Sequence, residues 1–486
     1  MNDLEKQLLK AATQGDAAAV RALLAQGVNP NAGEYASAEH DKNAGYNFCT
    51  PLMSATWEGH IDVVRLLLEA GADPNLADES GWTALMGAAD GGHTAIIRLL
   101  LARGANIDAV EQDFGTALTL AAEADCQNAA NALIEAGANI HIPGSHGHTP
   151  LMFATHGCIS TMRLLLDRGA DIEAANNHGS TALACAAVEG KMQAARLLLE
   201  KGANPNAAEN DGGTPLTNAA GYGHADMVRL LLEAGANINA ADENGYTALM
   251  QIARCECEEE HKQDDENRLR AMQVLLEKGA DIEAREWRGY TALMFAAESG
   301  NIGALRLLLD AGASVNAADD NGKTALMHAA DGYGENTAAA IPLLLRAGAN
   351  IRAADTSGRT ALTHAAGSES ADAIALLLEH EENIATACDA QGRSPLKIAL
   401  RHDRSNILKV FLDKGLDANT RDASGTPLLA IAAREGAVDC LRLLLAHGAQ
   451  LDATDAHGRA ALEHAEEYGR DATADILRRA TATNGS

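Results

Sequence analysis

The residues whose side chains are best suited to bind a metal or take part in a reaction lie in one short acidic segment, Cys255-Glu256-Cys257-Glu258-Glu259-Glu260-His261. Thiolate and imidazole groups are ligands that zinc prefers, and three or four of them can hold the ion. The spacing of Cys255, Cys257 and His261 matches no common zinc site, however, and a fourth ligand would have to be a carboxylate. Such a charge run is also typical of a solvated loop or a helix extension. We therefore expect no cofactor, and a metal- or small-molecule-dependent activity centred on Cys255–His261 is the alternative.

Three histidines occupy one equivalent position, because His328, His364 and His464 each follow a capping residue by four places. A metal pair or a pH switch is one interpretation of the first two. Neighbouring units of a helical array lie about 10 Å apart, which is too far for easy shared coordination. We therefore favour hydrogen bonding between units. The chain has no Ser/His/Asp order, glycine-rich phosphate loop or HExxH motif, so we predict that it is not an enzyme.

The elements that position these residues repeat about every 33 residues. The pattern is clearest in Thr83-Ala84-Leu85-Met86, followed by Ala88-Ala89, Gly92-His93, Leu99-Leu100-Leu101 and Gly104-Ala105-Asn106. The opening position recurs at Thr50, Thr83, Thr116, Thr149, Thr181, Thr214, Thr247, Thr291, Thr324, Thr360, Ser394, Pro427 and Ala460. A period of about 20–50 residues predicts a solenoid, in which each unit buries its apolar face only against its neighbours.

Each position of the repeat has a local physical reason. The threonine is a helix N-cap, whose hydroxyl accepts a hydrogen bond from a free backbone N–H in the first turn. The next residue is often proline, which needs no N–H at the first helical position. Glycines such as Gly104 end the second helix, because a left-handed residue is favourable there. The polar stretch that follows predicts an extended arm and a tight turn.

This combination resembles the ankyrin repeat, whose pattern runs T-P-L-H-x-A-A, then G-H, then V-x-L-L-L-x-x-G-A-D/N-x-N. The resemblance covers nearly the whole chain, in about 14 units, and is closest to stand-alone proteins of bacterial type. It implies an all-α repeat solenoid, with a helix-turn-helix and a β-hairpin loop per unit, stacked into a curved superhelix. It also implies a concave recognition surface made of hairpin tips and first helices.

One departure from the family pattern recurs, because the histidine after T-P-L is usually methionine here. The methionines in this position are Met53, Met86, Met152, Met250, Met294 and Met327. A methionine stripe is also found in ligand grooves. We favour core packing, because methionine fills irregular gaps between helices well.

The repeat pattern predicts one solenoid over residues 1–486, with breaks at defined places. We expect an N-terminal capping repeat at 1–32, a hairpin finger at 33–48, regular repeats at 49–254, an acidic insert at 255–268, repeats at 269–457 with an irregular stretch at 332–394, a C-terminal capping repeat at 458–480 and a tail at 481–486. The polar outer faces of the two end repeats are typical of caps. The finger either reaches a partner or packs on the first helices, and the acidic insert could dock a basic partner.

Composition limits the class of partner. The formal net charge is −29, which disfavours nucleic acid and anionic membrane and favours a basic or neutral protein, although solubility alone also explains it. The 8 cysteines show no paired spacing, as in a reducing compartment. The N-terminus resembles no signal peptide, and no apolar run reaches the ~20 residues of a membrane span. We expect a cytoplasmic protein that is a monomer or part of a hetero-complex.

The residue before each capping position lies at a hairpin turn, where the fold does not dictate its type. Aromatic and arginine side chains gather there and at the ends of first helices, and these residue types dominate binding hot spots. They could also simply cover the neighbouring hairpin. The predicted partner-binding residues are Tyr35, Tyr46, Trp57, Trp82, Tyr222, Tyr246, Trp287, Tyr290, Tyr333, Arg359 and Arg393.

These observations predict a non-enzymatic scaffold for protein–protein interaction. A rigid surface that binds through its concave face and fingers loses little entropy on binding. An inhibitor or a chaperone-like partner of a basic protein is a plausible role. Besides the metal-dependent activity, a second alternative is an acidic decoy of a nucleic-acid-binding protein, whose binding would weaken steeply with salt.

Overall fold

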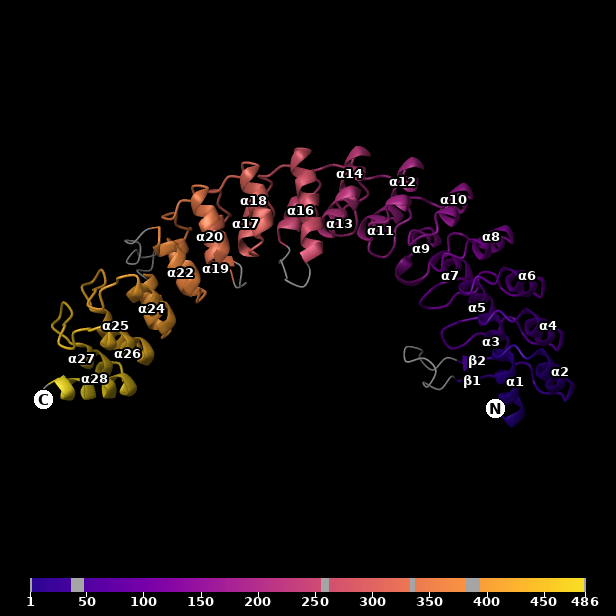
Figure 1. Cartoon of the computed structure of the whole chain (residues 1–486), viewed down its shortest axis with the longest axis horizontal. Helices are drawn as coiled ribbons and strands as arrows, with labels where there is room; N and C mark the ends of the chain where they lie inside the picture. The colour runs from indigo at the N-terminus through magenta and orange to yellow at the C-terminus, as the bar shows by residue number, and fades with distance from the viewer. Residues whose placement is uncertain (1, 36–47, 255–261, 333–336, 381–393, 485–486) are drawn as a thin grey trace. The chain divides into compact units, whose positions relative to one another are not determined.

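The computed structural model describes residues 2–35, 48–254, 262–332, 337–380 and 394–484. The chain divides into two compact units, Met1–Glu243 and Asn244–Ser486. Both consist of consecutive pairs of antiparallel helices joined by hairpin turns (Figure 1). The architecture is an all-α repeat solenoid, as the sequence predicts.

In the first unit, most first helices span seven residues and most second helices nine. The helices are α1 (Asp3–Thr13), α2 (Ala17–Ala25), α3 (Pro51–Trp57), α4 (Ile61–Glu69), α5 (Ala84–Asp90), α6 (Thr94–Ala102), α7 (Ala117–Glu123), α8 (Gln127–Glu135), η1 (Ser145–Gly147), α9 (Pro150–Ala154), α10 (Ile159–Asp167), α11 (Ala182–Val188), α12 (Met192–Glu200), α13 (Pro215–Gly221) and α14 (Ala225–Glu233). Two short strands, β1 (Glu34–Tyr35) and β2 (Phe48–Cys49), pair antiparallel, with Glu34 opposite Cys49. They form the base of the expected finger, whose residues 36–47 lie outside the described residues.

The second unit repeats this arrangement. Its helices are α15 (Ala248–Ala253), α16 (Lys262–Glu277), α17 (Ala292–Glu298), α18 (Ile302–Asp310), α19 (Ala325–Asp331), α20 (Thr337–Arg346), α21 (Ala361–Gly367), α22 (Ala371–Leu378), α23 (Pro395–Arg401), α24 (Ser405–Asp413), α25 (Leu428–Glu435), α26 (Val438–Ala446), α27 (Ala461–Glu467) and α28 (Asp471–Asn484). The sixteen-residue α16 begins within the acidic insert, which therefore extends a helix in part. The last helix reaches Asn484, four residues into the segment expected as a tail.

Helices of the same kind pack side by side within each unit. In the first unit, α3 lies between α1 and α5 in a row of first helices, while α4 packs between α2 and α6 in a row of second helices. The apolar faces of both rows are fully buried, as at Leu85 and Met86 of α5 and Ile97 and Leu100 of α6. Because each pair buries its apolar surface against its neighbours, the core is continuous within a unit. None of the described helices has the length and apolar character needed to cross a membrane.

The methionine position is part of this core. All six methionines that replace the family histidine are buried, so the core-packing prediction is confirmed. Met86, Met152 and Met294 also help to cap helices. The Thr83 hydroxyl accepts from the backbone N–H of Met86 at 3.4 Å, and the Met86 sulfur accepts from the Thr83 N–H at 3.4 Å. Each residue therefore satisfies a backbone donor that the helix leaves free.

Side chains in the arms connect consecutive repeats. The Asn206 Oδ1 accepts from the backbone N–H of Asn237 at 2.6 Å, and its Nδ2 donates to the Gly235 carbonyl at 3.1 Å. Asn75 makes the same two bonds to Asn106 and Gly104. One asparagine thus satisfies both an N–H and a C=O group of the next repeat.

We expect Asn206→Ala to lower the free energy of unfolding by about 1–2 kcal/mol, because two neutral hydrogen bonds are lost. Asn206→Asp keeps the acceptor and loses the donor, so its free energy of unfolding should lie between those of wild type and Asn206→Ala. Urea unfolding followed by circular dichroism measures the difference. An alanine variant as stable as wild type would show that the arm bonds do not couple repeats.

Candidate functional site

A carboxylate organises most of the hairpin turns. It lies five residues before the capping position, and its side chain accepts hydrogen bonds from turn amides. In the second unit, the Asp319 Oδ1 accepts from the backbone N–H groups of Asn321 and Lys323, each at 2.8 Å. Glu286 does the same one repeat earlier, accepting from Arg288 at 2.9 Å and Tyr290 at 3.1 Å. The turn conformation therefore depends on this side chain.

The three equivalent histidines bond to these turn carboxylates. The Nε2 atom lies 3.1 Å from Asp319 in His328, 2.9 Å from Asp355 in His364 and 3.0 Å from Asp455 in His464. Each of these carboxylates lies five residues before the capping position of the helix that carries its histidine, so the Nε2 bond joins a hairpin turn to the first helix that follows it.

The other ring nitrogen of His364 does reach the preceding repeat. Its Nδ1 atom lies 3.3 Å from Asp331, which also pairs with Lys323 at 2.6 Å. Burial tends to raise the pKa of Asp331, but His364 and Lys323 outweigh it and hold that pKa well below its usual range. An anionic Asp331 therefore joins two repeats of the second unit.

In the second unit, the side chain before the capping position can cover the surface that the hairpin turns and first helices form. The Tyr290 ring is only 8% exposed and lies 5.1 Å from the Phe295 ring and 4.4 Å from the His328 ring, centroid to centroid. The Arg288 guanidinium lies over the same ring, 4.5 Å from its centroid. The prediction that Tyr290 is an exposed partner-binding residue is therefore wrong: its ring covers the neighbouring repeat.

The other predicted partner-binding residues have different environments. Trp57 is 51% exposed and lies 5.5 Å from the half-buried Trp82 ring, and Trp287 is 66% exposed. Tyr246 is half-buried against Phe295, with ring centroids 5.4 Å apart. Arg359 is half-buried, Tyr222 is 59% exposed and Tyr35 lies in β1. Tyr46, Tyr333 and Arg393 lie outside the described residues, as does Cys255–His261.

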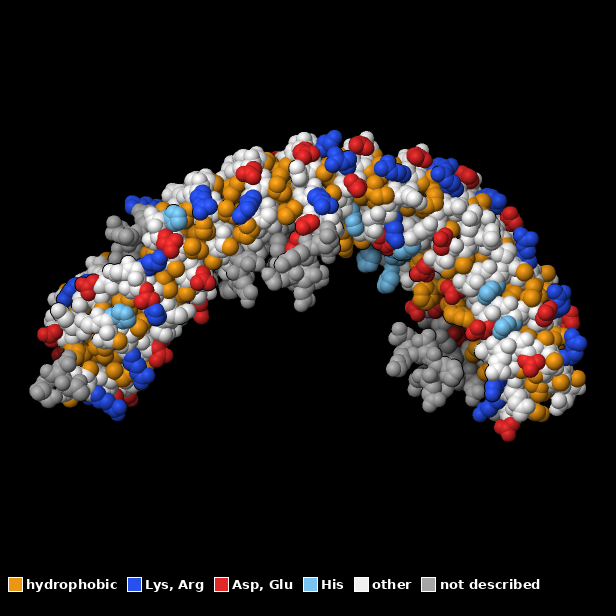
Figure 2. Space-filling model, in the orientation of Figure 1, with side chains coloured by type: hydrophobic (Ala, Val, Ile, Leu, Met, Phe, Trp, Pro, Cys, Tyr) orange, Lys and Arg blue, Asp and Glu red, His pale blue; other side chains and the backbone are white. Residues whose placement is uncertain are grey.

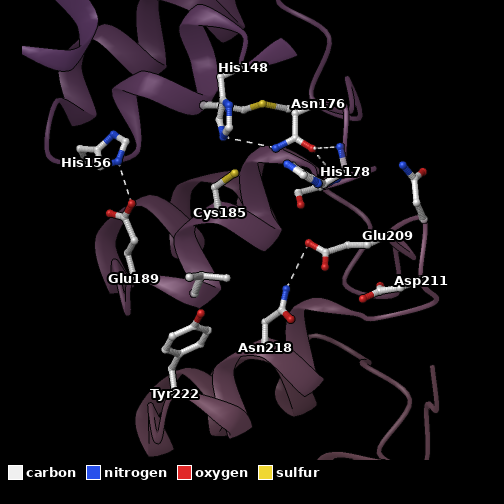
Figure 3. Close-up of a pocket in the computed structure, with 14 residues that line it drawn as sticks. His148, His156, Asn176, His178, Cys185, Glu189, Glu209, Asp211, Asn218 and Tyr222 are labelled. Carbon is white, nitrogen blue, oxygen red and sulfur yellow. Dashed lines mark hydrogen bonds and ion pairs between the residues drawn. The ribbon is translucent and has the colours of Figure 1, made fainter. Parts of the chain in front are cut away.

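In the first unit, the surface formed by the hairpin turns and first helices has a groove between α9 and α13. The residues before Thr181 and Thr214 are Ser180 and Gly213, where the second unit has Tyr290 and Lys323. Cys185 and Asn218 replace the bulkier Phe295 and His328 on the first helices. These smaller side chains leave a groove of about 520 Å³, within the range of about 300–1,000 Å³ that is typical of ligand sites (Figure 3).

Two sets of side chains line this groove. The first helices and their ends contribute Met152, His156, Cys185, Glu189, Asn218 and Tyr222. The hairpin turns contribute His148, Asn176, His178, Glu209 and Asp211. Histidine side chains accordingly gather on the hairpin side of α9 to α13 (Figure 2).

The hairpin before Thr214 uses its carboxylates differently from the hairpins before Thr291 and Thr324. Asp211 takes over the turn, because its Oδ1 accepts from the Gly213 N–H at 2.9 Å. Glu209, in the position of Asp319, instead accepts from the Asn218 side-chain amide at 3.2 Å (Figure 3). The Glu209 carboxylate is therefore directed to the groove.

The groove is acidic. Glu189, Glu209 and Asp211 line it, whereas none of the fourteen described residues that line it is lysine or arginine. Burial, and after it Glu209 and Glu189, raise the pKa of Cys185 to about 12. The thiol therefore stays protonated at neutral pH and is a poor nucleophile or metal ligand.

Within the part of the chain that the structure describes, no group of three or more His, Cys, Asp or Glu residues is arranged to hold a metal ion. The cysteines there, Cys49, Cys126, Cys158, Cys185 and Cys440, are free thiols. Neither the histidines of the groove nor those of the second unit therefore form a described metal centre.

The sequence prediction missed the groove because it followed the large side chains. Of the residues that line the groove, only Tyr222 is among the predicted partner-binding residues. The useful signal was that two consecutive repeats have a small residue, Ser180 and Gly213, immediately before the capping threonine.

Comparison with protein families agrees with the helix pairs and turns. A family of three-copy ankyrin repeats matches residues 2–78, 70–144, 262–355, 333–422 and 416–484. A many-copy family of ankyrin repeats matches residues 183–232 and 219–256, and the single ankyrin repeat matches residues 146–177. A search of the curated proteins finds no match. Because these matches extend over most of its length, the chain belongs to the ankyrin-repeat family.

Proposed function

We propose that this protein is a non-enzymatic scaffold that binds an extended segment of a partner protein along the hairpin side of its first unit. The groove between α9 and α13 carries this proposal, because it combines the volume of a binding site with polar groups from three consecutive repeats. Ankyrin repeats are in general protein-interaction modules. We further propose a basic partner, which the scaffold inhibits or escorts, because the groove is acidic.

Two other observations in the first unit support this function. Trp57 and Trp82 form a partly exposed aromatic pair, and tryptophan is enriched in binding hot spots. The raised pKa of Cys185 leaves the groove without an activated thiol, which supports binding rather than covalent catalysis.

Site-specific photo-crosslinking in the source cells tests the proposal. A benzophenone side chain at position 222 places the crosslinker in the groove, and the same group at the exposed position 229 on α14 is the control. We expect a discrete protein adduct from position 222 only. Equal adducts from both positions, or none from position 222, would contradict a partner site in the groove.

We expect Trp57→Ala to weaken binding of that partner by tenfold or more, because exposed tryptophans often contribute more than about 1.4 kcal/mol to an interface. The effect on stability should be small, since half of the side chain is exposed. Isothermal titration calorimetry with the purified partner measures it. Tyr468→Ala, at an equally exposed residue of the last helix pair, should leave affinity unchanged.

A further inference from the structure

Two carboxylates of the groove face Gly213 on the side where other residues carry a side chain. A Cβ atom added to Gly213 would lie 3.1 Å from the Asp211 Oδ1 and 3.3 Å from the Glu209 Oε2. The nearest atoms are therefore acidic oxygens of two side chains rather than backbone. A group that enters the groove here lies between two negative charges, and a cation is the occupant that they stabilise.

The last repeat shows what fills the equivalent position when it is occupied. Arg459 stands where Gly213 stands, and Asp455 stands where Glu209 stands, five residues before the capping position. The Arg459 guanidinium bonds to Asp455 through Nε at 3.1 Å and Nη2 at 3.0 Å, and to Glu467 through Nη1 at 2.7 Å. An arginine thus satisfies the turn carboxylate in that repeat.

The two repeats also share their aromatic residue. Tyr468 and Tyr222 both end the first helix, and both are more than half exposed. The Gly213 repeat therefore has a carboxylate and a tyrosine in the positions of Asp455 and Tyr468, whereas Gly213 and Gly221 stand where the last repeat has Arg459 and Glu467.

We propose that an arginine side chain of the partner segment enters the groove and takes the place that Arg459 fills in the last repeat. The inference rests on the proposed function, since it assumes a protein partner. Arginine fits better than lysine because its planar guanidinium can bond to Glu209 and Asp211 together and can stack on a tyrosine ring. Lysine presents a single ammonium group and cannot reproduce this geometry.

The test uses the full chain and a peptide library displayed on phage. Peptides are selected on wild type and counter-selected on Gly213→Arg, whose own side chain should fill the groove. The backbone at Gly213 does not have the positive φ that favours glycine, and the closest atoms that its Cβ would meet belong to the side chains of Asp211 and Glu209, which must shift by a few tenths of an ångström to admit it. Circular dichroism checks that the variant folds.

We expect the selected peptides to share an arginine. Changing it to lysine should weaken binding tenfold or more, and so should Glu209→Gln, which keeps the acceptor for Asn218 and removes the charge. Serine at position 213 is the matched control and should bind almost as wild type does.

The outcomes separate this inference from the proposed function. Peptides that Gly213→Arg excludes, but that lack arginine or bind equally with lysine, would overturn the arginine site and leave a segment-binding groove. Affinity unchanged by Glu209→Gln would also overturn it. If no selected peptide is excluded by Gly213→Arg, both the arginine site and the proposed function fail.

Discussion

Replacing Tyr290 with alanine is expected to lower the free energy of unfolding of the second unit by about 3–5 kcal/mol, the usual cost of deleting a large buried aromatic ring. The ring is almost fully buried, and it contacts Phe295 on its own first helix and His328 on the next. Alanine would leave a cavity between two repeats and remove the surface on which the Arg288 guanidinium lies. Because repeat arrays depend on contacts between neighbours, the loss should spread beyond one repeat.

Trp287 provides a local measurement of this loss. The chain has 3 tryptophans, so a Trp57→Phe/Trp82→Phe background leaves Trp287 as a fluorophore confined to the second unit. Urea unfolding in that background compares Tyr290→Ala with Tyr290→Phe, which keeps the ring and should lose about 1 kcal/mol or less. A loss below about 1 kcal/mol for Tyr290→Ala would show that the ring does not join the two repeats.

Tyr290 and Gly213 occupy the same repeat position and illustrate how much of the structure the sequence predicts. Periodicity predicts the helices, caps and turns, because these depend on local chemistry that recurs in every unit. It also places both residues at a hairpin turn. Whether a side chain there binds a partner or covers a neighbour depends on the residue it meets one repeat later, such as His328 for Tyr290. That contact lies across the stack, where a single repeat gives no information.

The candidate site was harder to predict for a related reason. A groove forms where side chains are missing, and Ser180 and Gly213 offer no functional group that attracts attention. The role of Glu209 was also hidden, because the residue type at its position is ordinary for a turn carboxylate. Only the transfer of the turn hydrogen bond to Asp211 directs Glu209 to the groove, and that transfer is a feature of geometry.

Asp319→Ala is expected to destabilise the second unit by about 3 kcal/mol or more at neutral pH. The Asp319 side chain is fully buried and accepts from two turn amides and from His328 Nε2. Alanine would remove the acceptor of the fully buried His328 ring, at about 1–3 kcal/mol, and of two part-buried turn amides, at about 0.5–1.5 kcal/mol each. Asp320→Ala is the matched control. That exposed neighbour pairs with Arg285 at 3.1 Å on the surface, so its loss should be about 1 kcal/mol or less.

The Asp319 carboxylate also makes the stability of the second unit depend on pH. Burial tends to raise the pKa of Asp319, but hydrogen bonds from His328 and the turn amides outweigh it and lower the pKa below its ordinary value. Its stabilising effect is therefore fully present above the unfolded pKa of about 3.9 and is lost as pH falls through the lower folded pKa. Protonation of Asp319 would place a neutral acid instead of a carboxylate opposite the His328 Nε2. On the other side of the ring, the Glu298 carboxylate lies 4.0 Å from the His328 Nδ1.

We therefore expect wild type and Asp319→Ala to differ most above pH 5 and to converge as the pH falls below 4. Urea unfolding of the Trp287 background at pH 7, 5, 4 and 3 measures this difference. A difference that stays constant down to pH 3 would contradict the depressed pKa, although not the structural role of the carboxylate. A difference that grows as pH falls would contradict both, because a carboxylate held anionic by its turn can only lose stabilising bonds when it is protonated.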